Sequence, residues 1–287
     1  AVTVNITDVN EFAPVLNDAS FDVVENSANG SAVGTVTATD ADATKTFNYS
    51  ITAGNELGIF VIHETTGAIT VLNTTNLDHE SISGVTLTVL VSDGGPGTAR
   101  TDAATVTVSI TDANEFAPVL NDVSFSIVEN SANGSAVGTV TATDADATKT
   151  LNYSITAGNE LGIFEINEAT GAITVLNKTN LDRELISAVT LTLEVSDGGP
   201  GTAQTDTAAV TINVTGVNEF APVFTSPTTL NVAQGLTDVG TVVTTDADQP
   251  AQTVTYMKSG VDAGKFTMTA GGVLTLNAVP DFGNPAD

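Results

Sequence analysis

The sequence predicts an all-β chain of tandem, seven-stranded Greek-key β-sandwiches joined end to end. Apolar residues alternate with polar ones at a period of two, as in Val85 to Val91, and this pattern is typical of half-buried strands. One seven-residue motif, Asp112 to Pro118, has close copies on either side that begin at Asp8 and Gly216, so each interval is 104 residues. No stretch keeps a 3.6-residue apolar period long enough for a helix of ordinary length.

The first complete repeat supplies seven candidate strands, each rich in β-branched residues and bounded by turn signals. They are Phe21 to Glu25, Val33 to Asp40, Phe47 to Ala53, Ile59 to His63, Ala68 to Leu72, Gly84 to Asp93 and Ala103 to Asp112. Asn29-Gly30, Thr66-Gly67 and Asp93 to Pro96 are turn signals between them. Seven short strands in about 100 residues are typical of an antiparallel sandwich.

A motif that recurs at the period of a small domain marks a junction, and its proline stops the preceding strand from continuing. We therefore predict complete repeats at 11–112 and 113–216, and a partial, divergent third repeat at 217–287. Residues 1–10 match the end of a complete repeat, and we expect them to be the last strand of a preceding, truncated one. The chain is then an excerpt from a longer array.

The composition excludes several classes of partner and chemistry. Lys and Arg total 7 against 34 Asp and Glu, and the net charge of −27 argues against nucleic acid and anionic membrane surfaces. Such acidity is expected of a protein whose bound cations are not counted. The absence of cysteine excludes disulfides and thiolate chemistry. No apolar run approaches 18 residues, so we expect no membrane insertion by this segment.

Oxygen-rich elements recur in each repeat at the ends of predicted strands. In the first complete repeat they are Glu25, Asp40 to Asp42, Asp78 to Glu80, Asp93 and Asp112 to Glu115. The first two strands of a sandwich run in opposite directions, so these elements divide between its two poles. A cation site that uses both groups can close only where two successive repeats meet. Oxygen ligands favour a hard cation.

Together these motifs resemble the calcium motifs of cadherin repeats, in the form found in large bacterial surface proteins. The similarity rests on Glu-Asn after the first strand, Asp-Ala-Asp, Leu-Asp-Arg-Glu at Leu181 to Glu184, Ser-Asp-Gly-Gly, and Asp-Ala-Asn-Glu-Phe-Ala-Pro. It covers both complete repeats and, more weakly, the third. The resemblance implies immunoglobulin-like sandwiches of the cadherin type, with three Ca²⁺ ions bound between successive domains.

Carried onto this sequence, the resemblance implies a set of ligands for the first junction. They are Glu25, Asp78, Glu80, Asp112, Asn114, Glu115, Asp144, Asp146 and Asp197, with the carbonyls of Ala113 and Phe116. Eight carboxylates would face the six positive charges of three ions, and without metal they would repel one another. Glu115 and Glu219 stand where the family usually has Asp, and Phe116 replaces the usual Asn.

The resemblance implies two further sites. At the second junction the ligands would be Glu129, Asp182, Glu184, Asn218, Glu219, Asp246 and Asp248. Gly216 replaces the leading Asp there, so we expect fewer ions or weaker binding. Near the N-terminus, Asn10, Glu11, Asp40, Asp42 and Asp93 would form the lower half of a site.

Each motif alone has a plainer interpretation as a solvated turn or a strand end. His63 and His79 could suggest transition-metal or catalytic chemistry, but Asn167 and Arg183 replace them in the next repeat, so we expect exposed surface residues. Paired carboxylates could suggest glycoside hydrolysis. A hydrolase needs one cleft, whereas these acids recur along an array with no Trp and three Tyr. We predict no enzymatic activity.

The sequence therefore favours a Ca²⁺-rigidified stalk or adhesive region of a secreted or cell-surface protein, with neighbouring repeats as its first partners. One alternative is a recognition module for a polysaccharide or another cell-surface protein. Another is a passive spacer beside an unseen catalytic domain. Homophilic adhesion, the activity of animal cadherins, depends on the outermost repeat and is not carried over.

Overall fold

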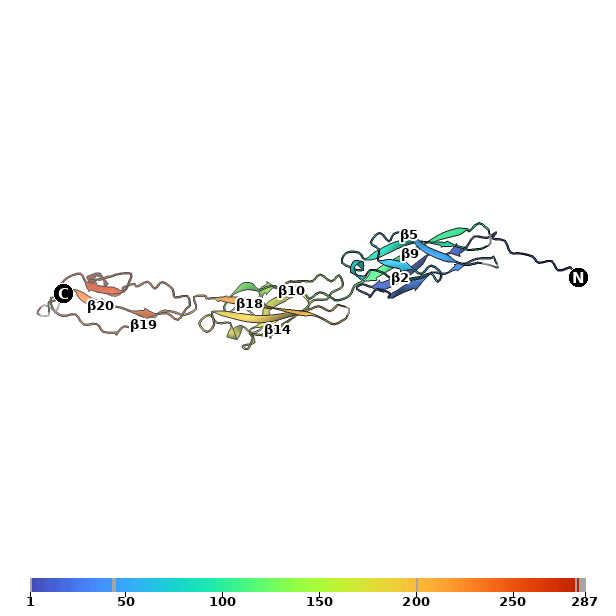
Figure 1. Ribbon diagram of the computed structural model, residues 1–287. Coiled ribbons are helices and arrows are strands. Elements are labelled where there is room, and N and C mark those ends of the chain that lie inside the picture. Colours follow the sequence, from blue (N-terminus) through green and yellow to red (C-terminus); the bar gives the residue numbers. More distant parts are fainter. Residues whose placement is uncertain (1, 43–44, 96, 200, 282, 284–287) are drawn as a thin grey trace. The chain divides into compact units, whose positions relative to one another are not determined.

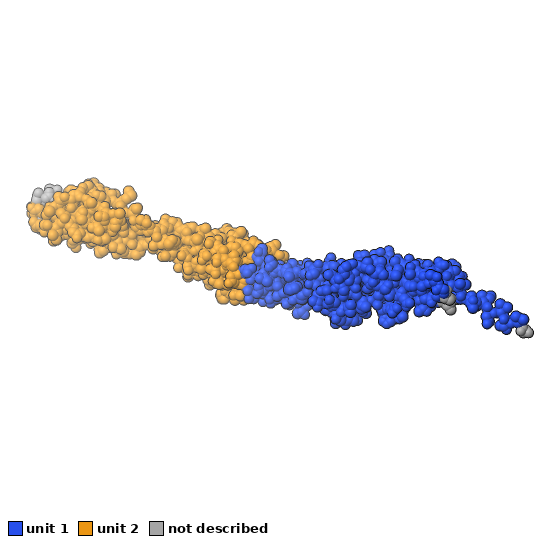
Figure 2. Space-filling view, turned by 45° about the horizontal axis from the view of Figure 1, so that its top comes forward, with its two compact units in different colours: residues 1–121, 141–153, 194–207 blue, residues 122–140, 154–193, 208–287 orange. Residues whose placement is uncertain are grey.

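The computed structural model describes residues 2–42, 45–95, 97–199, 201–281 and 283. The chain forms two compact units, each of which contains one of the predicted junctions (Figure 2). The first comprises residues 1–121, 141–153 and 194–207, and the second comprises 122–140, 154–193 and 208–287. The predicted repeat boundaries therefore do not coincide with the units, and they remain a prediction.

The first repeat is a sandwich of two sheets, as predicted (Figure 1). The larger sheet has the order β2-β9-β8-β5 and the smaller one β3-β7-β6, while β1 pairs with β4. The strands are β1 (Val15–Leu16), β2 (Ala19–Val24), β3 (Ala32–Thr35), β4 (Ala38–Thr39), β5 (Asn48–Ala53), β6 (Phe60–Ile62), β7 (Ala68–Val71), β8 (Gly84–Ser92) and β9 (Thr101–Thr111). A short 3₁₀ helix, η1 (Thr74–Asn76), precedes the Asp78 loop.

Two details differ from the prediction. The expected single strand from Val33 to Asp40 is broken into β3 and β4, because a bulge near Gly34 shifts the register and β4 pairs with β1 instead of β7. Gly34 also lies against Phe21, whose ring would be 2.3 Å from an added Cβ. The sandwich is not purely antiparallel, since β2 runs parallel to β9.

The core of this sandwich follows from the period-two pattern of its strands. Along β8, Val85, Leu87, Val89 and Val91 are buried, and the intervening threonines are exposed. They pack with residues of the opposite sheet such as Phe60. Burial of this apolar surface contributes about 25 cal/mol per Å² and fixes which face of each strand points inward. The strand ends carry the acidic motifs.

The second repeat reproduces this arrangement. Its larger sheet has the order β11-β18-β17-β14 and its smaller one β12-β16-β15, while β10 pairs with β13. The elements are β10 (Val119–Leu120), β11 (Val123–Val128), β12 (Ala136–Thr139), β13 (Ala142–Thr143), β14 (Asn152–Ala157), β15 (Phe164–Ile166), β16 (Ala172–Val175), η2 (Lys178–Asn180), β17 (Ala188–Ser196) and β18 (Thr205–Thr215).

The third repeat, at 217–287, has fewer strands over the described residues than the two complete repeats. It contains β19 (Val223–Phe224), β20 (Asp238–Thr241), β21 (Thr244–Thr245), η3 (Ala263–Lys265), β22 (Phe266–Met268) and β23 (Val273–Leu276). Their sheets are β20-β23-β22 and the pair β19-β21, with no described counterpart of the four-stranded sheet. No described apolar side chain of this unit reaches the burial of the two complete cores.

Residues 2–9 form no described strand, and Val2, Val4 and Ile6 are almost fully exposed. Their counterparts Val106 and Val108 are fully buried in β9. The assignment of this segment as the last strand of another repeat stays a prediction. No helix among the described residues is long and apolar enough to cross a membrane.

Candidate functional site

At the first junction, Glu25 is the centre of an upper cluster of carboxylates. It is buried, and its two oxygens accept hydrogen bonds from the backbone N–H groups of Ala113 (2.7 Å) and His79 (2.6 Å). Asn26 adopts a left-handed conformation (φ 54°), which asparagine tolerates better than most residues, and its amide donates to Glu115 (3.0 Å). Glu25, Glu80 and Glu115 thereby bring oxygen atoms within 4.8 Å of one another.

Two carboxylates connect this cluster to the second sandwich. Asp112, at the end of β9, accepts hydrogen bonds from the backbone N–H groups of Thr148 (2.7 Å) and Ala147 (3.3 Å) and from the Thr148 hydroxyl. Asp146 is fully buried and accepts from the N–H group of Phe116 (3.1 Å). The linker and the Asp-Ala-Asp loop are therefore tied together by acids from both sides.

Asn114, Asp144 and Asp197 are the residues that we call the lower pocket of the first junction. The Asn114 amide donates to Asp197 (2.8 Å), which also accepts from the Gln204 N–H group (2.9 Å). One oxygen of each of these three side chains, Oδ1 of Asn114 and Oδ2 of Asp144 and Asp197, is buried without a hydrogen-bond partner. Buried unpaired oxygens are costly, and a hard cation is one group that would satisfy oxygens of this kind.

The acids of the first junction perturb one another. Burial, contact with Asp112 and the charge of Glu25 raise the pKa of Glu80. Burial and the charge of Glu25 likewise raise the pKa of Glu115. Burial also raises the pKa of Asp146, although backbone N–H groups oppose it. For Asp112 burial acts in the same direction, but the hydrogen bonds from Thr148 outweigh it and the pKa is lowered. Burial is therefore the largest cause of the raised pKa values, and the neighbouring carboxylates add to it.

The two histidines have different environments. His63 is exposed, as expected. His79 is not, and the prediction of an exposed surface residue was wrong for it: its side chain is 20% exposed, with Nδ1 3.6 Å from Glu80 Oε1 and 3.8 Å from Asp112 Oδ1. The loop turn that delivers its N–H group to Glu25 also folds its ring over these acids.

The remaining residues predicted for the first junction lie in the same region. Asp78 accepts hydrogen bonds from the N–H group (3.0 Å) and hydroxyl (3.1 Å) of Ser81, which hold its side chain within its own loop. The Phe116 carbonyl accepts from the Gln204 side chain (3.1 Å), so part of its capacity as a ligand is already used. No described contact defines a role for the Ala113 carbonyl.

The N-terminal half-site repeats the lower pocket. The Asn10 amide donates to Asp93 (2.7 Å), and the N–H group of Phe12 donates to Asp42 (3.1 Å). Buried oxygens without partners again occur on Asn10 (Oδ1), Asp40 (Oδ2) and Asp93 (Oδ2), the counterparts of the three at the first junction. Glu11 is exposed. The predicted turn after Asp93 ends at Pro96, outside the described residues.

The second junction keeps the upper cluster. Glu129 accepts hydrogen bonds from the N–H groups of Val217 (2.6 Å) and Arg183 (2.6 Å), and Asn130 (φ 57°) donates to Glu219 (2.6 Å). Oxygen atoms of Glu129, Asp182 and Glu184 lie within 4.8 Å of one another. Asp248 is buried and accepts from the N–H groups of Glu219 and Phe220, both at 3.1 Å.

The lower part of the second junction differs from that of the first. The Asn218 amide donates to the Gln252 side-chain carbonyl (2.6 Å), where Asn114 meets a carboxylate at the first junction. Asp246 accepts the N–H group of Asp248 (3.1 Å). Among the described atoms, neither Asn218 nor Asp246 carries a buried oxygen without a partner.

Several positioning residues were not predicted from the sequence. Thr148 and Lys149 belong to the 22-residue stretch that is identical in both complete repeats, and this identity is a signal that could have found them. Lys149 donates to the carbonyls of Asp144 (2.7 Å) and Asp146 (2.6 Å), which fixes the Asp-Ala-Asp loop. Gln204 gives no such signal, because Arg100 occupies the equivalent position.

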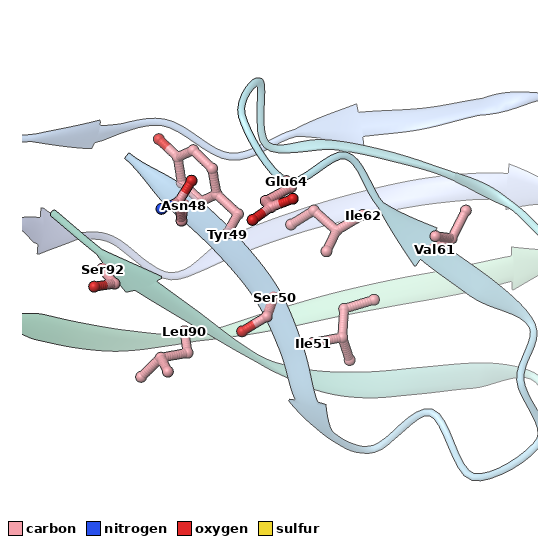
Figure 3. Close-up of a pocket in the computed structure, with 9 residues that line it drawn as sticks. All are labelled: Asn48, Tyr49, Ser50, Ile51, Val61, Ile62, Glu64, Leu90 and Ser92. Carbon is pink, nitrogen blue, oxygen red and sulfur yellow. The ribbon is translucent and has the colours of Figure 1, made fainter. Parts of the chain in front are cut away.

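A depression lies on the first sandwich (Figure 3). Its lining comes mainly from β5, β6 and β8 and includes Tyr49, Ile62, Glu64 and Leu90. Glu64 is the only charged residue in this lining. Beside this carboxylate the lining is made of apolar side chains, hydroxyl groups and one amide.

Comparison with known proteins identifies the relatives of this fold. The family model of the cadherin domain matches residues 19–111 and 123–215. The protocadherin-like wing polarity protein stan of Drosophila melanogaster is 37% identical over 238 residues, which are 79% of this chain and 6% of that protein. Human cadherin-23 is 33% identical over 299 residues, 96% of this chain and 9% of that protein. The chain thus spans less than a tenth of either relative.

Solved structures agree on the fold. A crystal structure of mouse cadherin-23 EC22-24 has a TM-score of 0.68 at 24% identity, covering 96% of this chain and 91% of that one. The protocadherin gammaB7 EC3-6 cis-dimer structure has a TM-score of 0.77 at 22% identity, covering 97% and 72%. The predicted family is confirmed, while the bacterial form of the motifs remains a prediction.

Proposed function

Since this chain belongs to the cadherin family, we propose that it is a calcium-binding segment of an extracellular adhesion or stalk region. The observation that carries the proposal is the first junction, where acids from two successive sandwiches meet around one linker. Cadherin domains bind Ca²⁺ between repeats, and an all-oxygen donor set suits this ion.

Each part of the first junction has a role in this proposal. Glu25, Asp78, Glu80 and Glu115 would hold calcium in the upper cluster, and Asn114, Asp144 and Asp197 would hold it in the lower pocket. Asp112 and Asp146 would connect the two. The buried unpaired oxygens of the lower pocket support a bound cation, because nothing in the described protein satisfies them.

Calcium would act by joining neighbouring repeats. Because the ligands come from both sides of the linker, binding favours the arrangement in which they are close and opposes their mutual repulsion. The expected result is a stiffer linker and a more stable protein. The domain boundaries at 112–113 and 216–217 are part of this proposal.

Two measurements test the proposed function. Calorimetric titration of the calcium-free chain should show saturable Ca²⁺ binding, and small-angle scattering should show a change in interdomain order when calcium is chelated. Asp146→Ala should remove calcium from the first junction. A chain that binds no calcium, or an identical scattering profile in excess chelator, would contradict the proposal.

A recognition module is the second candidate function. The depression between β5 and β6 offers some apolar surface, including Ile51 and Leu90, at the edge of both sheets. The second repeat has Glu165 where the first has Val61, so this surface is not repeated along the chain. Binding to a glycan array in calcium would favour this candidate.

A further inference from the structure

We propose that Lys149 is a positioning residue for the calcium of the first junction: its ammonium group binds the backbone of the Asp-Ala-Asp loop and thereby holds the two carboxylates of that loop in place for a cation. The inference rests on the proposed function of the first junction. It goes beyond that function, because a positive side chain beside a cation site would by its charge alone weaken the binding of calcium.

The Lys149 side chain returns to the backbone of its own loop. Its Nζ atom donates to the carbonyl of Asp144 (2.7 Å) and to the carbonyl of Asp146 (2.6 Å). An ammonium group has three donors and no acceptor, so one nitrogen can hold both carbonyls at once. Residues 144–149 belong to no helix or strand, and these two hydrogen bonds therefore close the loop where no regular structure does.

The two carboxylates of the loop are held by other groups. Asp144 Oδ1 accepts the N–H group of Asp146 (2.9 Å), and Asp146 accepts the N–H group of Phe116 (3.1 Å). No ion pair joins Lys149 to either carboxylate among the described residues. The ammonium group therefore fixes the backbone without occupying the carboxylates, and the buried Oδ2 of Asp144 is left for another partner.

Lys149 has two opposite effects on a cation, and their sizes decide the outcome. The side chain is exposed, so water and salt screen the repulsion between its charge and a bound ion. Its hydrogen bonds to the two carbonyls are charge-assisted and are stronger than those between neutral groups. A loop that is held in its binding geometry before the ion arrives loses less conformational freedom on binding. The net effect of Lys149 should therefore be to strengthen calcium binding.

The same arrangement occurs in the first repeat. Lys45 donates to the carbonyl of Asp40 and to the carbonyl of Asp42 (2.9 Å). The chain has only 7 Lys and Arg, and this is the one position at which both complete repeats have one of them. Two of the few positive side chains are thus used to hold loops that carry proposed calcium ligands.

Amide hydrogen exchange of the full chain at increasing Ca²⁺ concentration tests the inference at the first junction itself. The measured midpoint is the free Ca²⁺ concentration at which residues 112–116 reach half of their maximal protection. Lys149→Met should raise this midpoint by about tenfold, the lower end of the loss in affinity that is typical when a group that orients metal ligands is removed. In EGTA the same variant should exchange faster than wild type at residues 144–149, because the loop has lost two hydrogen bonds.

Two matched variants separate position from charge and from general stability. Lys45→Met deletes the equivalent hydrogen bonds in the first repeat and should leave the midpoint at residues 112–116 unchanged. Lys178→Met removes the same charge from an exposed side chain and should also leave this midpoint unchanged. Circular dichroism checks that each variant is folded.

The outcomes separate the inference from the function on which it rests. An unchanged or lower midpoint in Lys149→Met would show that the lysine acts only as a surface charge, which overturns the inference and leaves the proposed function intact. An equal rise in Lys45→Met or Lys178→Met would overturn it too, because the effect would then not come from the loop of the first junction. If calcium gives the wild-type chain no protection at residues 112–116, the proposed function fails as well.

Discussion

The two junctions share five consecutive residues, Asn-Glu-Phe-Ala-Pro, but the side chains around those residues differ. At both, a buried glutamate receives two backbone N–H groups and a left-handed asparagine holds the linker glutamate. The described contacts differ in the next repeat, which contributes Thr148 and Asp197 from two separate loops at the first junction, and Gln249 and Gln252 from one loop at the second. The linker motif therefore marks a junction without determining which side chains of the next repeat contact it.

Removal of calcium should give the largest effect and should separate the two junctions. At a free concentration about 100 times Kd, each bound ion adds about 2.7 kcal/mol to the free energy of unfolding. We expect excess EGTA to lower the melting temperature. Amide hydrogen exchange should increase more at residues 112–116 than at 216–220. Equal increases at both segments would contradict the comparison.

The substitutions Asp146→Ala and Asp248→Ala should sharpen the comparison between the two junctions. Both carboxylates are buried and accept linker N–H groups, so each substitution should cost about 1–3 kcal/mol of stability in EGTA. In calcium the cost of Asp146→Ala should become larger than that of Asp248→Ala, because only the first also removes the connection to a complete lower pocket. Urea unfolding in the two buffers measures both values. Equal costs in calcium would show that the junctions bind alike.

The pH dependence should change sign with calcium. The pKa values of Glu80, Glu115 and Asp146 are raised above 4.5, 4.5 and 3.8, so these acids bind protons more readily in the folded state. In EGTA, stability should therefore rise as the pH falls from 7 through the raised values toward 4.5. The lowered pKa of Asp112 opposes this only near and below 3.8.

In calcium, protons compete with the ions for the same oxygens, and stability should fall over the same range. Urea midpoints at several pH values, with and without calcium, measure the sign. A fall in stability from pH 7 in both buffers would show that these acids do not bind protons more readily in the folded state.

The smallest expected effect is on stability, when each of the tyrosines that follow the two Asp-x-Asp loops is changed to phenylalanine. The hydroxyl of Tyr153 accepts the N–H group of Ala142 (3.0 Å), whereas Tyr256 contacts only the Thr244 hydroxyl (3.1 Å) among its described hydrogen bonds. Tyr153→Phe should cost about 0.5–1.5 kcal/mol, and Tyr256→Phe should cost less, because it leaves a rotatable hydroxyl and not a backbone N–H group without its partner. Thermal unfolding of both variants checks the order.

Much of the fold could be predicted because its causes are local. The alternation of Val85 to Val91 fixes the inward face of β8, and the recurring junction motif gives the period. The break between β3 and β4 could not be predicted, since it depends on β1 pairing across the sandwich. The parallel pairing of β2 with β9 is likewise a tertiary outcome that no alternation pattern encodes.

Some residues of the candidate site could likewise be predicted from the sequence and others could not. Glu25, Asp112, Asp146 and their copies could be found because residue type and order carry the signal. His79 was misjudged, because its loop conformation and not its identity folds it over the acids. Gln249 and Gln252 carry no signal of their own, and only the structure shows that they contact Glu184 and Asn218.

The parallel pairing of β2 and β9 has a mechanical consequence. Six consecutive residue pairs, from Ala19 with Val106 to Val24 with Thr111, join a strand near the start of the repeat to the strand that ends it. Tension applied through the backbone pulls these two strands in opposite directions along their length. The hydrogen bonds between them are then loaded together in shear and do not break one after another. The parallel pair β11 and β18 gives the second repeat the same resistance.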